Sequence, residues 1–382
     1  MGWDRRDTMH IQAAVLRETH ATGPYGQSRP LGVETLDLEA PGFGEVLVEI
    51  KAAGLCHSDL SVMDGSRPRP LPMALGHESV GVVRAVGRGV STLAVNDHVV
   101  STFVPSCGQC LPCQEGRPAL CHMAAKSNGE GVLLSGSRRL RKGHEYIHHH
   151  LGVSAFATYA VMDQHSLIKI PYDLPFEKAA LFGCAVLTGV GAVINTARIE
   201  AGARVAIVGL GGVGFSALLG AIVAGAAMIM AIDINPDKLK RAQTLGATHV
   251  INATEVDASK MARDVSNGGV DYAIEAAGSV EAMALAYQIT CRGGTTVTAG
   301  LPHPSKHFSF PLVTMVAEER TVKGSYMGSS VPRRDIPRYV DLYRQGRLPI
   351  DQLLTDRIAL KDINQGFDRL ANGLSIRTVI LF

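Results

Sequence analysis

Apolar and polar residues alternate along short segments of the first hundred residues. The alternation is seen in Val46–Ile50, and glycines such as Gly54, Gly76 and Gly87 separate neighbouring segments. A period of two is typical of half-buried strands, and glycine is typical of the turns between them. The pattern predicts an irregular antiparallel β domain with strands at Ala13–Arg17, Glu45–Ala53, Ser79–Val86 and Asp97–Val100.

The periodicity changes near Lys178, where helical and strand patterns begin to alternate. A helix is predicted over Ala179–Thr196, and Gly209–Gly225 continues helically after its first glycines. Strands that alternate with helices imply right-handed crossovers and an α/β fold with a doubly wound parallel sheet. The predicted strands are Ala203–Val208, Ala227–Asp233, Thr248–Asn252, Asp271–Glu275 and Thr295–Gly300, and Arg377–Phe382 ends the chain as a strand.

Length and charge narrow the class of protein. The chain has 382 residues, which favours two domains because single cores rarely grow past roughly 250–300 residues. Its 37 basic and 35 acidic residues give a formal charge of +2. This near balance argues against a protein held to nucleic acid or to a membrane by basic residues. The basic segment Lys126–Lys142 is therefore expected to form a solvated surface loop.

No segment has the pattern of a signal peptide or of a membrane span. The first ten residues are polar and charged, and we expect them to form a disordered leader. The longest apolar passage, Val205–Ile232, is interrupted by six glycines and combines strand and helix patterns. These features predict a cytoplasmic protein.

A glycine-rich loop joins the strand at Ala203–Val208 to the helix that follows. It reads G-x-G-x-x-G, in which the first glycine allows a tight turn and the second lets the backbone approach a pyrophosphate. The third glycine allows the helix to pack on the strand, and the N–H groups at the helix start face the anion. The residues expected to hold a dinucleotide here are Gly209, Gly211, Gly212, Val213 and Gly214.

Asp233 ends the next predicted strand at the distance expected for ribose recognition. Its carboxylate would hydrogen-bond the adenosine ribose hydroxyls and repel a 2′-phosphate. The following residues, Ile234–Asp237, contain no arginine that could bind such a phosphate. NAD is therefore predicted over NADP. A competing interpretation gives this region an N-cap role for the next helix, which Asp237 could fill instead.

Four of the seven cysteines lie within fifteen residues, with two, two and seven residues between them. Four thiolates with such short gaps can surround one tetrahedral Zn²⁺, and closed four-cysteine sites are structural. An odd number of cysteines argues against a disulfide framework. A nucleic-acid-binding zinc module would need a basic recognition helix, whereas prolines surround this cluster. The predicted ligands of a structural zinc are Cys107, Cys110, Cys113 and Cys121.

A second set of metal-binding residue types is dispersed along the chain. Two thiolates and one imidazole would leave an open position on zinc for water or substrate. Ser58 offers a hydroxyl to take an alcohol proton, Asp59 could orient the imidazole, and Glu78 could lie behind the metal. The predicted ligands of this catalytic zinc are Cys56, His77 and Cys184.

In this combination of motifs, the sequence resembles the zinc-dependent medium-chain alcohol dehydrogenases from about Gln12 to Phe382. The resemblance rests on Gly76-His77-Glu78, the four-cysteine lobe, Gly183-Cys184 with Thr188-Gly189, the Gly209–Gly214 loop and Ser375–Thr378. The segment between Cys121 and His150 is similar to the animal-type and glutathione-dependent branch, whose members are usually homodimers. The resemblance implies a GroES-like catalytic domain at residues 1–186 with its zinc lobe at 107–121, an NAD-binding Rossmann domain at 187–327, and a return to the catalytic domain at 328–382.

The resemblance also implies roles for individual residues. Water or Glu78 is the fourth ligand of the catalytic zinc, and Ser58 joins the substrate to a proton relay. The remaining cofactor contacts are Asp233 and Lys238 at the ribose, His57 and Arg377 at the pyrophosphate, and Thr188. The residues that line the alcohol pocket are Phe103, His150 and Leu151.

Several positions depart from the pattern of that family. Ser61 stands where many animal-type members have a histidine that passes the proton to solvent. Glutathione-selective members carry an acidic residue before Gly-His-Glu and an arginine soon after the cysteine lobe. This chain has Arg67 and Arg69 in the first segment and lacks arginine between residues 121 and 138, which disfavours hydroxymethylglutathione. His150 is polar where an apolar or aromatic residue is commoner, and a surface histidine at a strand start is its alternative interpretation.

The sequence thus predicts a zinc-dependent alcohol dehydrogenase with two zinc ions per chain. It would transfer hydride reversibly between a primary, secondary or aromatic alcohol and NAD through a zinc-bound alkoxide. Its expected partners are a small alcohol or aldehyde and a second copy of the chain, with no nucleic acid and no membrane. Three alternatives stay open: an S-(hydroxymethyl)glutathione dehydrogenase, a zinc-free quinone or enoyl reductase of the same superfamily, and a non-enzymatic binding protein that retained the fold.

Overall fold

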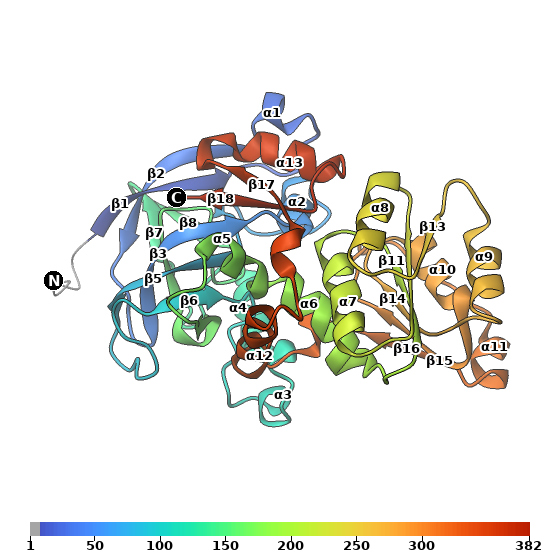
Figure 1. The fold of residues 1–382 in the computed structure, drawn as a ribbon. Coiled ribbons are helices and arrows are strands. Elements are labelled where there is room, and N and C mark those ends of the chain that lie inside the picture. Colours follow the sequence, from blue (N-terminus) through green and yellow to red (C-terminus); the bar gives the residue numbers. More distant parts are fainter. Residues whose placement is uncertain (1–7) are drawn as a thin grey trace. The chain divides into compact units, whose positions relative to one another are not determined.

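The computed structural model describes residues 8–382, which form two compact units (Figure 1). The first unit comprises the chain up to residue 184 with residues 331–337 and 354–382, and the second comprises residues 185–330 and 338–353. The disordered leader expected over the first ten residues is wrong for residues 8–10, because they belong to a strand that begins at Thr8. The rest of that leader lies outside the described residues.

The first unit contains a closed barrel of five strands in the order β1-β2-β7-β8-β4. These strands are β1 (Thr8–Leu16), β2 (Leu31–Glu39), β4 (Met73–Ala74), β7 (Leu140–Lys142) and β8 (Glu145–His149). Every second residue of β1 from Ile11 to Val15 lies in the barrel core, as the period of two requires. The barrel core is therefore built on the alternation seen in the sequence.

The first unit also contains a seven-stranded sheet in the order β10-β6-β5-β3-β18-β17, with β9 paired to β3. β18 lies at the C-terminal end of the chain and runs antiparallel to β3, so the chain returns to this unit. The strands are β3 (Glu45–Gly54), β5 (Glu78–Val86), β6 (His98–Ser101), β9 (Tyr159–Asp163), β10 (Leu167–Lys169), β17 (Leu354–Ile358) and β18 (Arg377–Leu381). The helices of this unit are α1 (Tyr25–Ser28), α2 (His57–Met63), α3 (Leu111–Gln114), α4 (His122–Glu130), α5 (Phe176–Ala179) and α13 (Ile363–Ala371).

The second unit is a six-stranded parallel sheet in the order β13-β12-β11-β14-β15-β16. This order is that of a doubly wound nucleotide-binding sheet, so the predicted α/β fold class is confirmed. The strands are β11 (Arg204–Val208), β12 (Met228–Asp233), β13 (His249–Asn252), β14 (Val270–Glu275), β15 (Thr290–Thr298) and β16 (Thr321–Gly324). The helices are α6 (Ala185–Gly191), α7 (Gly212–Val223), α8 (Pro236–Thr244), α9 (Ala258–Val265), α10 (Val280–Ile289) and α11 (Leu312–Ala317), and α12 (Pro332–Arg344) has residues in both units.

The single helix predicted over Ala179–Thr196 is wrong. The segment consists of the end of α5, the 3₁₀ turn η3 (Ala180–Gly183), α6, and the π-helical turn η4 (Ala192–Ala197). The break falls at Cys184, whose φ of −138° and ψ of −70° are not helical. The residues on both sides of Cys184 are apolar, so the hydrophobic pattern does not mark the break.

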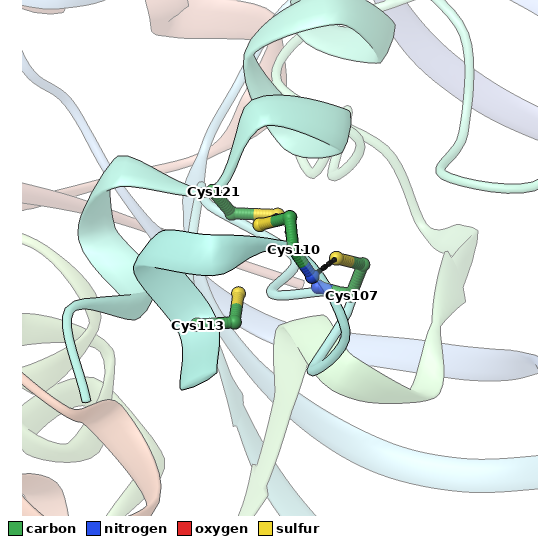
Figure 2. Close-up of side chains that lie close together, drawn as sticks. All are labelled: Cys107, Cys110, Cys113 and Cys121. Atoms are coloured by element: carbon green, nitrogen blue, oxygen red, sulfur yellow. Dashed lines mark hydrogen bonds between the residues drawn. The ribbon is translucent and has the colours of Figure 1, made fainter. Parts of the chain in front are cut away.

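A small lobe of the first unit spans residues 107–121. It contains α3 and the 3₁₀ turn η1 (Pro118–Leu120), and two of its prolines lie at the starts of these turns. Figure 2 shows that the four cysteines of this lobe carry their sulfur atoms toward one another.

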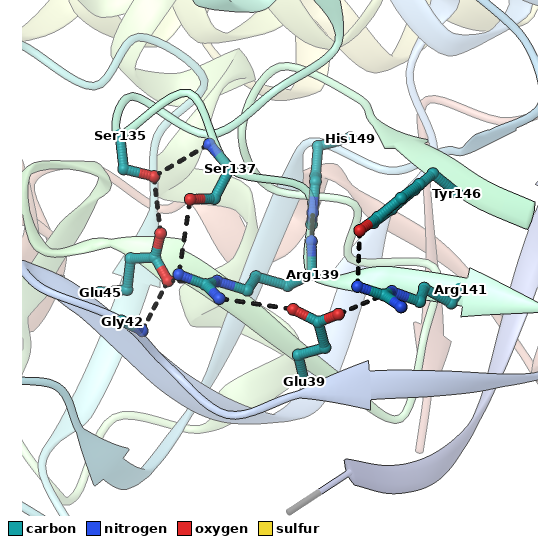
Figure 3. A network of polar contacts seen from close by, with 9 residues as sticks. All are labelled: Glu39, Gly42, Glu45, Ser135, Ser137, Arg139, Arg141, Tyr146 and His149. Carbon is teal, nitrogen blue, oxygen red and sulfur yellow. Dashed lines mark hydrogen bonds and ion pairs between the residues drawn. The ribbon is translucent and has the colours of Figure 1, made fainter. Parts of the chain in front are cut away.

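The segment Lys126–Lys142 is not the solvated loop that its charge predicts. It starts inside α4 and ends with β7, and Leu133 and Leu140 are buried in the barrel core. Arg139 Nε donates to the fully buried Glu45 carboxylate at 2.8 Å, and Arg139 Nη1 lies 3.4 Å from Glu39 (Figure 3). The arginine is therefore part of an internal polar network that no local pattern in the sequence reveals.

Among residues 8–382, no single helix is long and apolar enough to cross a membrane. One bent pair of helices, residues 176–183 and 185–197, passes the same test by length and composition alone.

Candidate active site and zinc sites

The four lobe cysteines form a compact cluster of sulfur atoms, all within 4.8 Å of one another. All four are free thiols. Backbone N–H groups point at the sulfurs: Cys107 N donates to Cys121 Sγ at 3.3 Å, and Cys110 N donates to Cys107 Sγ at 3.4 Å. N–H donors of this kind favour thiolates over thiols. The predicted structural zinc residues are thus brought together in an arrangement that suits a closed tetrahedral site.

The electrostatics of this cluster also suit a cation. Backbone hydrogen bonding at Cys113 lowers the pKa of Cys110 to about 6, whereas burial raises the pKa of Cys113 to about 12. Four adjacent thiolates repel one another, and a divalent cation would allow all four to ionise. The donor set therefore fits zinc.

A second cluster, in the first unit, brings together residues that are far apart in the sequence. Cys56 follows β3 and precedes the first residue of α2, His77 immediately precedes β5, and Cys184 follows η3. Their ligand atoms and a carboxylate oxygen of Glu78 all lie within 4.8 Å of one another, and all four residues are buried. The structure thus places the three predicted catalytic zinc ligands and Glu78 in one site.

The thiols and the carboxylate of this cluster are strongly coupled. Contact with Cys184 lowers the pKa of the Cys56 thiol well below its ordinary value, and the same contact raises the pKa of Cys184. Burial raises the pKa of Glu78 to about 7, against the opposing effect of Arg377. Glu78 Oε2 is buried with no hydrogen-bond partner among the described residues. An orphaned carboxylate oxygen beside two thiols and an imidazole fits a bound cation.

Arg377 is buried in this cluster at the start of β18. Its Nη1 donates to the backbone oxygen of Leu55 at 3.1 Å and lies 3.2 Å from Glu78 Oε1. The resemblance assigned Arg377 to the cofactor pyrophosphate, and it gave no sign of the ion pair with Glu78. A contact between residues 299 positions apart has no local signal in the sequence.

Asp59 lies behind His77. Its Oδ2 is 2.9 Å from Nδ1 of His77, and its Oδ1 is 3.0 Å from Nδ1 of His150. His150 is buried, so its interpretation as a surface histidine is wrong. The ring of Phe103 packs edge-on against the ring of His77, with centroids 5.5 Å apart. Leu151, the third residue assigned to the alcohol pocket, is also buried.

The residues predicted to carry the proton lie at the start of α2. Ser58 is half-buried, and His57, the first residue of the helix, is exposed. Ser61 donates its hydroxyl to the backbone oxygen of His57 at 2.9 Å. The hydroxyl of Ser61 is thus hydrogen-bonded to the backbone of the preceding helical turn.

Two buried polar residues near the predicted pocket were not found from the sequence. Asn128 Nδ2 donates to the backbone oxygen of Phe103 at 2.9 Å. Ser154 Oγ accepts from the backbone N–H of His150 at 2.8 Å and donates to the backbone oxygen of Ala74 at 2.8 Å. Asn128 and Ser154 fix the backbone at Phe103 and His150, two residues that the sequence did predict for the pocket. Neither Asn128 nor Ser154 was assigned a role from the sequence.

The glycine-rich loop lies in the second unit, between β11 and α7. Gly209 has a φ of +93°, and a Cβ on Gly214 would lie 1.8 Å from the backbone oxygen of Gly209. Both positions therefore require glycine, the first for the turn and the second for close packing. Gly212 and Val213 are in the first turn of α7, and a Cβ on Gly211 would meet no atom within 4 Å. The loop has the form expected of an anion-binding turn.

Asp233, at the end of β12, is tied to this loop. Its Oδ2 accepts from the backbone N–H of Leu210 at 2.6 Å, and its Oδ1 accepts from the backbone N–H of Asn235 at 2.9 Å. The side chain that caps α8 is Asn235, which accepts from two backbone N–H groups, so the region does supply the N-cap, but Asp237 is not the capping residue. Lys238 is half-buried in the first turn of α8, and Thr188 is buried in α6.

Comparison with known proteins agrees with this architecture. A family model described as "Alcohol dehydrogenase GroES-like domain" matches residues 42–172. A second model, described as "Zinc-binding dehydrogenase", matches residues 212–345.

Full-length relatives are similar along nearly the whole chain. The S-(hydroxymethyl)glutathione dehydrogenase of Paracoccus denitrificans is 38% identical, over 98% of this chain and 100% of that protein. The class-3 alcohol dehydrogenase of Cereibacter sphaeroides is 37% identical over the same shares. Among solved structures, an alcohol dehydrogenase zinc-binding domain protein from Burkholderia ambifaria has a TM-score of 0.93 at 38% identity, covering 98% of this chain and 100% of the other. The benzyl alcohol dehydrogenase of Acinetobacter calcoaceticus has a TM-score of 0.91 at 34% identity, covering 98% and 99%.

A doubly wound sheet with its glycine-rich loop, joined to a GroES-like unit, defines a nucleotide-dependent dehydrogenase. The chain belongs to the zinc-dependent medium-chain alcohol dehydrogenases, as the resemblance predicted. It is an oxidoreductase whose cofactors are zinc and NAD, and its substrates are small molecules.

Proposed function

We propose that the chain interconverts primary, secondary or aromatic alcohols and their carbonyl products with NAD, at a zinc ion held by Cys56, His77 and Cys184. The observation that carries this proposal is the convergence of two thiols and one imidazole, all buried and within 4.8 Å of one another. Three such ligands leave a fourth position open. When bound there, zinc supplies a Lewis acid that polarises the substrate oxygen and favours loss of its proton.

We assign a second zinc to the lobe of four cysteines. Its four sulfur ligands leave no open position, so the role of this ion is structural. The free thiols and the N–H groups directed at their sulfurs support the assignment.

Ser58 is the residue that we assign to the substrate proton. It lies two residues after Cys56 in the first turn of α2 and is half-buried, which suits a group that must exchange a proton with the outside. Since Ser61 replaces the relay histidine of many relatives, the proton would leave through the cofactor ribose, His57 or water. Asp59 and Glu78 support the site from behind, through His77 and Arg377 respectively.

The second unit is assigned to NAD. Each oxygen of Asp233 accepts one backbone N–H, so the carboxylate keeps lone pairs for the ribose hydroxyls. Lys238, Thr188 and the residues of the glycine-rich loop complete the proposed cofactor contacts.

We propose that the functional domains are residues 1–186, 187–327 and 328–382. The first two boundaries differ from those of the compact units by two and three residues, and residues 338–353 cluster with the second unit.

The substrate is proposed to be an alcohol without glutathione. Arg67 and Arg69 occupy the segment where glutathione-selective members have an acidic residue, and one of the similar solved structures is a benzyl alcohol dehydrogenase. Hydroxymethylglutathione is the second candidate, because it is the substrate in the name of a relative 38% identical. NADH formation, measured with benzyl alcohol, aliphatic alcohols and hydroxymethylglutathione in parallel, separates the two. A kcat/KM highest for hydroxymethylglutathione would contradict the first proposal.

We also propose a homodimer in the cytoplasm. β16 ends the parallel sheet on one side, and α11 directly precedes it in the sequence. The α11 side chains Leu312, Val313 and Val316 are 69%, 71% and 74% exposed. Within residues 8–382, β16 pairs only with β15, and an open strand edge and exposed apolar side chains are each typical of a protein interface. A second copy of this chain is the proposed partner.

A further inference from the structure

Asp59 is a buried carboxylate that stands between two imidazoles. Its Oδ2 lies 2.9 Å from His77 Nδ1, and its Oδ1 lies 3.0 Å from His150 Nδ1. Oδ1 also accepts the backbone N–H of Gly76 at 3.0 Å. The two imidazole contacts have the length of hydrogen bonds without their ideal direction. One backbone N–H and two imidazole nitrogens at contact distance therefore surround this fully buried carboxylate.

His150 is itself held firmly in the first unit. Its backbone N–H donates to Ser154 Oγ at 2.8 Å, and that hydroxyl donates to the backbone oxygen of Ala74 at 2.8 Å. The rings of His150 and His77 pack edge-on, with centroids 5.6 Å apart at 87°. The backbone of His150 is thus tied through Ser154 to the barrel strand that contains Ala74, and its ring packs against the ring of His77.

We propose that His150 is a positioning residue for the catalytic zinc, because its contact with Asp59 holds that carboxylate against His77. This inference rests on the zinc site proposed above. With Nδ1 of His77 engaged by Asp59, Nε2 is the ring nitrogen left for a metal. Removing His150 takes away one of the two groups that contact Asp59 Oδ1, so the backbone N–H of Gly76 alone would hold this oxygen and the carboxylate would be less firmly fixed against His77. Loss of a group that contacts a metal ligand directly commonly changes metal affinity by about 10- to 100-fold, and His150 acts one contact further out, through Asp59.

A role confined to lining the alcohol pocket makes a different prediction. An aromatic residue is common at this position in the family, and a phenyl ring could line a pocket without contacting Asp59. A pocket role would change the KM of alcohols and leave the metal unaffected. Zinc release therefore distinguishes the two roles without reference to activity.

The test compares wild-type holoenzyme with His150→Phe, His150→Ala and His150→Asn. Release of zinc into excess chelator is followed spectrophotometrically, and the d–d spectrum is recorded after Co²⁺ replaces the labile ion. His150→Phe and His150→Ala are expected to release the labile zinc about tenfold faster and to shift the Co²⁺ spectrum. His150→Asn keeps an N–H near the position of Nδ1 and is expected to resemble the wild type. If the phenyl variant does not fold, the alanine variant gives the same comparison.

His149→Phe is the matched control. His149 is the neighbouring buried histidine, but its Nε2 accepts from the backbone N–H of Arg139 at 3.1 Å, away from Asp59. Its zinc release should equal that of the wild type. Equal release from His150→Ala and wild type would overturn the inference, and so would equally fast release from the alanine and asparagine variants. A wild-type enzyme without any chelator-labile zinc would instead refute the proposed catalytic zinc site.

Discussion

The two fully buried carboxylates of the candidate site, Asp59 and Glu78, have pKa values shifted in opposite directions. Burial alone would raise the pKa of both. At Asp59, contacts with His77 and His150 outweigh burial and lower the pKa, whereas at Glu78 burial dominates and raises the pKa to about 7. Asp59 is thus suited to a permanent negative charge behind an imidazole. With a pKa of about 7, Glu78 is suited to change its charge with its surroundings, and a nearby cation would favour its ionised form.

The proposed proton transfer is tested by Ser58→Ala. The substitution removes the hydroxyl two residues after Cys56, so kcat should fall by about 10²–10⁴-fold while zinc content stays unchanged. Single-turnover hydride transfer is the measurement, because product release can limit steady-state turnover. The matched control is Ser61→Ala on the same helix, whose hydroxyl donates to a backbone oxygen. An unchanged single-turnover rate in Ser58→Ala would refute the role of Ser58.

Cofactor choice is tested at Asp233. The carboxylate should reject a 2′-phosphate, so kcat/KM with NAD should exceed that with NADP by at least roughly tenfold, about 1.4 kcal/mol. Asp233→Gly should narrow this gap mainly by weakening NAD. Since Asp233 also accepts the Leu210 N–H, the variant should lose some affinity for both cofactors. Equal use of both cofactors by the wild type would show that Asp233 does not select between them.

At the scale of elements, the parallel sheet was predicted better than the first unit, where seven strands were not predicted: β2, β4, β7, β8, β9, β10 and β17. Each of the five strands predicted for the parallel sheet is present, because short segments rich in apolar and β-branched residues and bounded by glycine are typical of buried strands, whereas β16 was not predicted. The helix broken at Cys184 and the segment 126–142 were not predicted. In the segment 126–142, a contact with a distant part of the chain holds the backbone, because Arg139 pairs with Glu45, 94 residues away.

In the candidate site, too, local patterns could be predicted from the sequence and contacts between separate elements could not. Cysteine spacing and the glycine-rich loop are local patterns, so the residue types most specific to zinc and dinucleotides could be found from the sequence. The contacts of Arg377 with Glu78 and of His150 with Asp59 join separate elements. Such pairs have no spacing rule, and only the folded chain reveals them.

The network that holds segment 126–142 to β8 should make stability depend on pH. Burial lowers the pKa of His149 to about 3, from an ordinary value of 6.5. The unfolded chain therefore binds a proton between these pH values and the folded chain does not, so stability falls as pH falls. Between about pH 6.5 and the folded-state pKa of about 3, His149 should contribute a loss of unfolding free energy of up to about 1.4 kcal/mol per pH unit.

Denaturant unfolding at several pH values measures this contribution. His149→Gln removes the titrating group, so its unfolding free energy should decline less steeply with acid than that of the wild type. His144→Gln, at an exposed histidine before the same strand, serves as the control. Parallel pH dependences of wild type and His149→Gln would contradict the assignment.

At the scale of the whole molecule, the proposed dimer depends on the apolar surface of α11. Val316→Lys places a charge where 74% of the side chain is exposed, so it should disrupt an interface without disturbing the core. Sedimentation analysis should find two chains in the wild type and one in the variant. Val256→Lys, at an exposed valine of the same unit, should remain dimeric. A monomeric wild type would contradict the proposal.

The account as a whole depends on two zinc ions that differ in lability. The lobe site has four sulfur ligands and is closed, whereas the site at Cys56, His77 and Cys184 has an open position. The most direct test is to measure zinc content, activity and circular dichroism of the purified enzyme while a chelator is added. We predict two zinc ions per chain at the start, with loss of one ion and of activity together while the fold persists. A fully active enzyme that contains a single zinc per chain would contradict the account.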